Sequence, residues 1–197
     1  PTDAGINHDT TPAFDVDEGG PYALAFVGGM NNITIDDALN NQAGNEIHVQ
    51  VRNRCGDDQT GTEYNVSLSS GSLGLTGDTT ETTVSGLVVF SDVTTCDLDL
   101  GATVSASATG LNGATSSTFD VTNGAADHWL FVAQPVDITV DQVIQSSGNQ
   151  IQVRAVDQCD NSVEFTNGTV TMSANGFSFS SGTVTRNVIN GVATFND

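Results

Sequence analysis

The chain has 197 residues, of which 24 are acidic and only 4 are basic, so its formal net charge at pH 7 is -20. This charge repels nucleic-acid phosphates and anionic membrane surfaces, and therefore argues against a protein that binds either. The sequence contains no apolar run of the length that crosses a membrane as a helix, and the start at Pro1 without a signal peptide predicts a mature or excised fragment.

Short runs in which apolar residues alternate with Ser, Thr, Asn or Asp predict β-strands along the chain. In chain order, clear examples are residues 47–51, 66–68, 104–108 and 151–155. Alternation with period two, β-branched side chains and Gly or Asn between the runs are typical of strands with one buried face. No segment predicts a convincing helix. The sequence therefore predicts an all-β protein.

The strand pattern repeats after about 105 residues, the spacing from Phe14 to Phe119. A one-residue deletion shortens part of the second copy. The matching pairs include Phe14 with Phe119, Phe26 with Phe131, Ile33 with Ile138, Ile47 with Ile151, Cys55 with Cys159, Gly86 with Gly191, and Phe90 with Phe195. Self-similarity at a fixed period is typical of a tandem repeat protein.

The repeat predicts boundaries inside the chain. Residues 1–20 are expected to be the last strand of a preceding repeat or a donated strand, and residues 21–125 a complete repeat. Residues 126–197 are expected to be a repeat without its last two strands, the counterparts of residues 103–108 and 117–121. Two explanations stay open: the chain is cut from a longer array, or another chain supplies the strands. Residues 10–16 are of the right type to be a donated strand.

Four runs of sequence carry a family resemblance: HWLFVAQPVDITV, NQIQVRAVDQCDNSV, INGVATFND and ATVSASATGLNGATSSTFDV. In this order and spacing they resemble bacterial immunoglobulin-like domains of the invasin and intimin type. The resemblance implies an all-β fold of tandem immunoglobulin-like β-sandwiches. It also implies a rigid stalk on a cell-surface adhesin. The cysteines at Cys55 and Cys159 and the absence of Lys depart from the family pattern.

We expect a structural role and no enzymatic activity. The histidines His8, His48 and His128 are not accompanied by a nucleophile motif, a metalloprotease motif or a Gly-rich phosphate loop. The predicted function is a stalk or filament segment of an extracellular surface fibre, stiffened where repeats meet. The alternative is an adhesin module whose loops bind a carbohydrate or a protein receptor.

The cysteines predict a disulfide between repeats. In the sandwich that the resemblance implies, Cys55 and Cys96 lie at opposite ends of one repeat, about a strand length apart, too far for a disulfide. Cys96 at the exit of one repeat would instead meet Cys159 at the entry of the next, and Cys55 would pair with a neighbouring repeat or chain. Two alternatives stay open: a Cys55–Cys96 bridge in a repeat with an added strand, or three free thiols. A disulfide indicates an extracellular or cell-surface location.

Aspartates are expected to gather at the same junctions, where carboxylate and carbonyl oxygens could bind Ca²⁺. Solvated turn aspartates are the other explanation. The candidate residues are Asp92, Asp97, Asp99, Asp120, Asp127, Asp157 and Asp160 at one junction, and Asp15, Asp17, Asp57 and Asp58 at the other. Asn-x-Ser/Thr triplets at Asn32, Asn65 and Asn167 permit glycosylation in a secreted protein. The expected partners are neighbouring repeats of the same or identical chains, with strand exchange into a filament.

Overall fold

The structure is a computed structural model of the chain. It describes residues 12–13, 15–42, 44–139, 143–144, 150–176, 178–179 and 182–196. All the regular secondary structure in these residues is β-strand, so the prediction of an all-β protein is confirmed. Within the same residues, no helix is long and apolar enough to cross a membrane.

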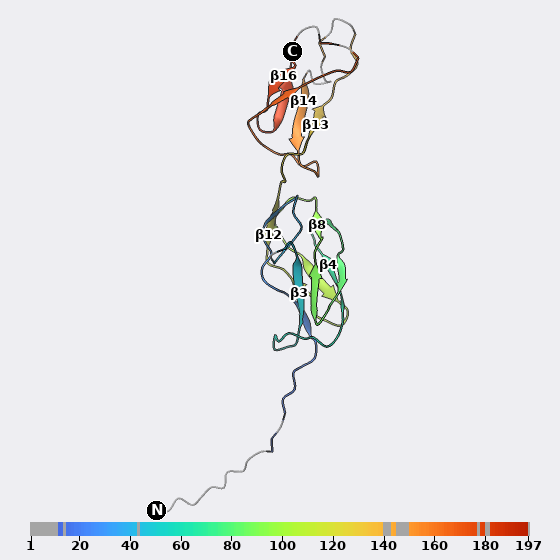
Figure 1. Cartoon of the computed structure of the whole chain (residues 1–197), viewed down its shortest axis with the longest axis vertical. Coiled ribbons are helices and arrows are strands. Elements are labelled where there is room, and N and C mark those ends of the chain that lie inside the picture. Colours follow the sequence, from blue (N-terminus) through green and yellow to red (C-terminus); the bar gives the residue numbers. More distant parts are fainter. Residues whose placement is uncertain are drawn as a thin grey trace, which may run out of the picture.

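The described part of the chain contains seventeen strands. They are β1 (Ala23–Phe26), β2 (Ile33–Thr34), β3 (Ile47–Arg52), β4 (Asn65–Ser69), β5 (Leu75–Thr76), β6 (Thr80–Thr82), β7 (Leu87–Phe90), β8 (Thr94–Thr95), β9 (Asp99–Ala102), β10 (Ser105–Ala108), β11 (Ala114–Thr115), β12 (Phe119–Thr122), β13 (His128–Ala133), β14 (Ile151–Val156), β15 (Thr169–Thr171), β16 (Thr185–Asn187) and β17 (Val192–Phe195). We call β1 to β12 the first unit and β13 to β17 the second unit. Figure 1 shows the two units one after the other along the long axis of the molecule.

The first unit is a set of small sheets around one core. Its sheets have the strand orders β1-β3-β7, β11-β10-β4-β6, β2-β12-β9 and β5-β8. The alternation seen in the sequence explains the core, because Ile47, Val49 and Val51 of β3 are all at most 1% exposed. Phe90 of the same sheet belongs to the same buried cluster, as do Val66 and Phe119 from two other sheets. Because apolar side chains line one face of each strand, the sheets bury those faces together.

The second unit repeats the strand pairing of the first. Its sheet β13-β14-β17 has the order of β1-β3-β7, and its pair β15-β16 corresponds to β4-β6. The registers also agree, since Ile47 faces Phe90 in the first unit and Ile151 faces Phe195 in the second. The repeat read from the sequence therefore extends to the pairing of individual residues.

Gly86 and Gly191 occupy equivalent tight turns that lead into β7 and β17. Each follows a residue with positive φ: the values are 51° for Ser85 and 77° for Gly86, then 50° for Asn190 and 74° for Gly191. Two successive positive φ values define a turn in which glycine is strongly favoured at the second position. A β-carbon at either glycine would also overlap a backbone carbonyl, that of Gln59 or Val163. The turn geometry thus explains why glycine recurs here.

The two units differ in what covers β1 and β13. In the first unit the backbone N–H of Leu24 in β1 donates to the Asn112 carbonyl at 2.9 Å, and β12 pairs in parallel with β2. The described residues after β13 contain no counterpart of β9 to β12. As a result Trp129 is 42% exposed, whereas its counterpart Leu24 is 4% exposed.

Candidate functional site: the junction between the two units

A disulfide joins the units at their junction. Cys96 directly follows β8 of the first unit, and Cys159 lies in the turn after β14 of the second. The two residues are 63 positions apart in sequence, and their Cα atoms are 5.5 Å apart, within the usual range for a disulfide. This is the pair that the sequence predicts, and the alternative Cys55–Cys96 bridge is not formed. Cys55 is an exposed free thiol.

The buried carboxylate of Asp157 organises the turn that carries Cys159. Asp157 is 0% exposed, and its Oδ1 accepts hydrogen bonds from the backbone N–H groups of Cys159 and Asn161, both at 3.0 Å. The other oxygen, Oδ2, accepts from the N–H of Gly124 at 3.3 Å. Hydrogen bonds from N–H groups stabilise a buried anion. One side chain therefore fixes the turn and also holds the connection between the units.

The linker between β12 and β13 lies between two carboxylates, one from each unit. The N–H of Gly124 points to Asp157, and the N–H of Ala125 donates to Oδ2 of Asp36 in the first unit at 2.8 Å. A β-carbon at Gly124 would lie 2.5 Å from one oxygen of Asp36 and 2.6 Å from the other. A larger residue at this position would have to displace the Asp36 carboxylate, and with it the hydrogen bond from Ala125.

Three further side-chain hydrogen bonds tie the second unit to the first unit or the linker. The Gln158 amide donates to the carbonyl of Ile35 at 3.3 Å, and the Asn161 amide donates to the carbonyl of Cys96 at 3.3 Å. In addition, the linker residue Asn123 donates to the Ser162 carbonyl at 2.8 Å. Together with the disulfide, these bonds restrain the relative position of the two units.

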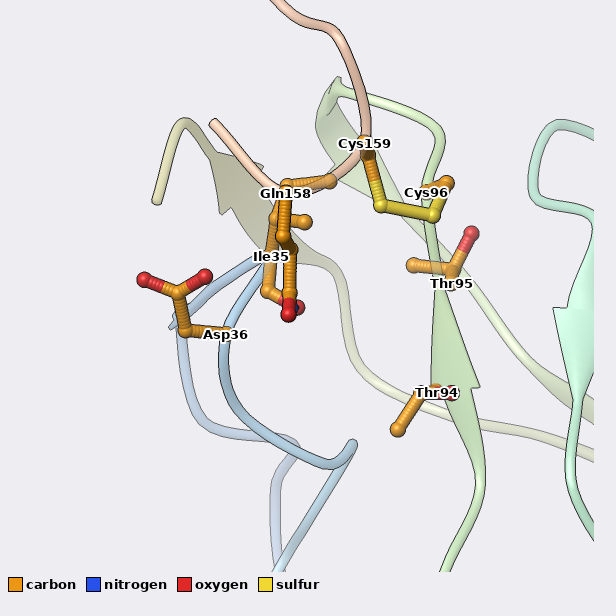
Figure 2. A pocket seen from close by; sticks show the side chains of 7 residues that line it. All are labelled: Ile35, Asp36, Thr94, Thr95, Cys96, Gln158 and Cys159. Atoms are coloured by element: carbon orange, nitrogen blue, oxygen red, sulfur yellow. A yellow bond between two sulfur atoms is a disulfide. The ribbon is translucent and has the colours of Figure 1, made fainter. Parts of the chain in front are cut away.

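A small cavity of about 300 Å³ lies beside the disulfide. Figure 2 shows its lining: Ile35 and Asp36 of the first unit, Gln158 of the second unit, and the cystine that joins the two units. The lining also includes Thr94 and Thr95 of β8. Both units contribute to the lining, so the cavity is part of the contact between them.

His128 connects the linker to the turn of the second unit. Its Nδ1 lies 2.9 Å from Oδ2 of Asp127, and its Nε2 lies 3.0 Å from Oδ1 of Asp160. The hydrogen bond with Asp127 raises the pKa of His128 above its ordinary value of 6.5, and the nearby charge of Asp160 acts in the same direction. Because the side chain is 43% exposed, solvent weakens this interaction.

The first unit has an equivalent turn at its own entry. Oδ1 of Asn53 accepts from the N–H groups of Cys55 at 2.8 Å and Asp57 at 2.9 Å, as Asp157 does in the second unit. The other polar atom of the Asn53 side chain is the amide nitrogen Nδ2, which donates to Oδ2 of Asp57 at 3.0 Å. The guanidinium of Arg54 lies over the Tyr22 ring at 4.6 Å, whereas its counterpart Gln158 reaches across the junction. Cys55 thus holds the position that Cys159 holds in the disulfide.

The structure does not bring the predicted calcium ligands together. Among the described residues, no three His, Cys, Asp or Glu side chains converge closely enough to hold a metal ion. Several of the aspartates bind nearby backbone N–H groups instead: Asp97 accepts from Gly74 at 2.6 Å, Asp92 from Asp78 at 3.1 Å and Asp120 from Gly101 at 2.9 Å. Asp58 lies 3.1 Å from the Arg52 Nε. The N–H donors are 14 to 23 residues away in sequence, so these bonds connect separate segments of the first unit, and calcium binding stays a prediction.

The remaining candidate residues for calcium binding and for glycosylation lie away from the junction or form none of the contacts described above. Asp15 and Asp17 are exposed and precede the first unit, and Asp99 is in β9. The three candidate glycosylation sites, Asn32, Asn65 and Asn167, are all exposed. Oδ1 of Asn32 accepts from the Asp120 N–H at 2.8 Å, and Oδ1 of Asn65 accepts from the Thr82 hydroxyl at 2.7 Å.

No protein-family model matches the sequence, and no curated protein matches it either. A solved structure of domains 4–9 of the surface layer protein SbsC is similar over 90% of this chain, with 16% identity and a TM-score of 0.33. The chain spans 27% of the length of that structure. A likeness of this size does not establish a shared function.

Proposed function

We propose that this chain is a segment of an extracellular stalk or filament, built from tandem immunoglobulin-like β-sandwich units whose junctions are locked covalently. The observation that carries the proposal is the Cys96–Cys159 disulfide, which crosses from the first unit to the second. A disulfide placed between units contributes little to either core, but it restricts motion of one unit against the next. A disulfide also favours an oxidising compartment, and hence the cell exterior.

Other features support a mechanical role. The linker is held between Asp36 and Asp157, so the non-covalent contacts reinforce the disulfide at the same place. The acidic composition keeps chains soluble and apart. We extend the proposal upstream: Cys55 would form the same kind of bridge with the exit of another repeat. We propose no catalytic role, because the sequence offers no nucleophile, base and orienting group in a recognised pattern.

The experiment that tests this function combines peptide mapping with measurement of the distance between labels on the two units. Non-reducing peptide mapping of the secreted protein should recover a Cys96–Cys159 peptide pair. Reduction should then broaden the distribution of distances between labels placed on the two units, while each unit stays folded. A Cys55–Cys96 linkage, or an unchanged distance distribution after reduction, would refute the covalent junction.

A ligand-binding adhesin module is the second candidate, and one observation favours it. Trp129 and Phe131 are 42% and 45% exposed in the second unit, and exposed aromatic side chains can form platforms for carbohydrates or protein receptors. They occupy positions that in the first unit belong to Leu24 and Phe26, which pack in the core. A Trp129→Ala variant that loses glycan binding would support this candidate, and no binding in a glycan array would count against it.

A further inference from the structure

The sequence contains several Asn-Gly pairs, and one of them lies in the linker between the two units. The pairs have their Asn at positions 112, 123, 167, 175 and 190. In such a pair the backbone nitrogen of Gly can attack the side-chain carbonyl carbon of Asn, because Gly has no β-carbon to hinder the approach. The reacting atoms must meet in a defined geometry, so hydrogen bonds that hold the Gly N–H or the Asn amide slow the reaction.

Contacts at the junction hold both reacting groups of Asn123-Gly124. The side-chain nitrogen of Asn123 donates to the Ser162 carbonyl at 2.8 Å, and the N–H of Gly124 donates to Oδ2 of the buried Asp157 at 3.3 Å. Both acceptors belong to the segment 157–162, which carries Cys159. Asn123 directly follows β12 of the first unit, so motion of one unit against the other separates it from Ser162. The pair is therefore protected while the junction is closed.

Two other Asn-Gly pairs in the second unit show the extremes of protection. Asn167 and Gly168 are both exposed, and within the described part of the chain neither the Asn167 side chain nor the Gly168 N–H forms a hydrogen bond. In the pair Asn190-Gly191, by contrast, the N–H of Gly191 donates to the Phe165 carbonyl at 2.8 Å, a contact within the second unit. The chain thus carries an unprotected pair and a pair protected by the fold of one unit, besides the linker pair that the junction protects.

We propose that Asn123 is a modification site that the closed junction masks, and that opening of the junction converts it to aspartate or isoaspartate. The inference rests on the proposed function, in which a disulfide locks the junction. The Gly124 nitrogen loses its proton to solvent and forms a bond to Cγ of Asn123, while the bond from Cγ to Nδ2 breaks and ammonia leaves. Water then opens the resulting succinimide ring at either carbonyl carbon, so the net change is the gain of water and the loss of ammonia.

The product weakens the contacts that had protected the linker. A carboxylate at position 123 cannot donate to the Ser162 carbonyl, and it adds a negative charge close to the carboxylates that hold the next two residues, Asp157 and Asp36. Like charges at short distance raise the free energy of the closed state. In isoaspartate the backbone also gains a methylene group directly before Gly124. A junction that has opened for long enough therefore closes less tightly afterwards.

The test uses the full chain at mildly alkaline pH, where the Gly nitrogen loses its proton faster. One sample keeps its disulfide, and the other is reduced and alkylated. Peptide mapping by mass spectrometry should show modification at Asn167 in both samples and none at Asn190 in either. At Asn123 the modification should be roughly tenfold faster after reduction, a factor that corresponds to the loss of one hydrogen bond to a charged group.

Two variants separate the contributions to this masking. Asp157→Asn removes the acceptor of the Gly124 N–H while the disulfide stays in place, and it should also speed up modification at Asn123. Gly124→Ala, reduced in the same way as the parent, should slow it, because a β-carbon hinders the attacking nitrogen.

Three outcomes would overturn the inference. The first is an equal rate at Asn123 in the two samples. The second is modification at Asn190 after reduction, because the protection would then come from the fold of the second unit and not from the junction. The third is an unmodified Asn167, because an exposed Asn-Gly pair of this chain would then be unreactive. Each result leaves the Cys96–Cys159 peptide pair and the label distances unchanged, so failure here is distinct from failure of the proposed function.

Discussion

Replacing Asp157 by Asn changes one atom of the junction while preserving the turn beside it. The side-chain oxygen that accepts from Cys159 and Asn161 is retained. The second oxygen becomes an NH₂ group, so a donor then faces the N–H of Gly124. The turn of the first unit shows that an amide is compatible with this fold, because Asn53 holds the same place.

The expected cost follows from what is lost. The substitution removes one hydrogen bond to a carboxylate and leaves the Gly124 N–H facing a second donor. Losing a partner in a partly buried site costs about 1–3 kcal/mol in the free energy of unfolding. For a unit of this size, each kcal/mol lowers the melting temperature by roughly 4–8 °C. We therefore expect the second unit to melt at least about 4 °C lower in D157N.

The single tryptophan makes the assay specific to the second unit. Trp129 is the only tryptophan of the chain and lies in β13, so its fluorescence follows unfolding of that unit. Asp137→Asn controls for the loss of one negative charge, since Asp137 is an exposed aspartate of the same unit. D157N should lower the midpoint of the fluorescence transition and D137N should not. Equal midpoints for D157N and the parent would refute the role given to Asp157.

Three further predictions concern the same junction. Gly124→Ala should destabilise the chain by about 0.5–1.5 kcal/mol, because the added methyl group displaces the Asp36 carboxylate from its hydrogen bond with Ala125. Gly20→Ala, where a β-carbon meets no atom within 4 Å, should leave the stability unchanged, and urea unfolding of both variants measures the difference. Because the pKa of His128 is raised in the folded state by Asp127 and Asp160, its contribution is complete below about pH 6.5 and is lost as pH rises through the folded pKa. Melting curves across that range should show this loss in the parent, and a pH dependence unchanged in His128→Asn would contradict it. Millimolar Ca²⁺ should raise the melting temperature relative to EDTA if the aspartate-rich turns bind it, and identical curves would count against calcium.

The sequence by itself determined the strand type and the repeat. Alternating apolar residues can bury one face only as strands, so the all-β prediction needed no tertiary information. The spacing of matching residues, such as Ile47 with Ile151 and Phe90 with Phe195, predicted the repeat, and the structure pairs these residues in the same register in both units. In the sandwich that the family resemblance implies, strand direction favoured Cys96 with Cys159 over Cys55 with Cys96, and the alternatives of a Cys55–Cys96 bridge and of free thiols stayed open.

Only the tertiary structure decided which polar residues meet at the junction. Asp36, Gly124 and Gln158 carry no motif, and they come together because the linker passes between turns that are far apart in sequence. The recurrence of Gly19 as Gly124 was the one signal that could have pointed to the linker. Asp92, Asp97 and Asp120, which were predicted as calcium ligands, accept from N–H groups 14 to 23 residues away in sequence, so only the folded chain brings these donors to them. Calcium binding itself stays a prediction. The sequence showed that aspartates lie in the segments near the junction. The folded structure determined which N–H group or side chain each carboxylate contacts.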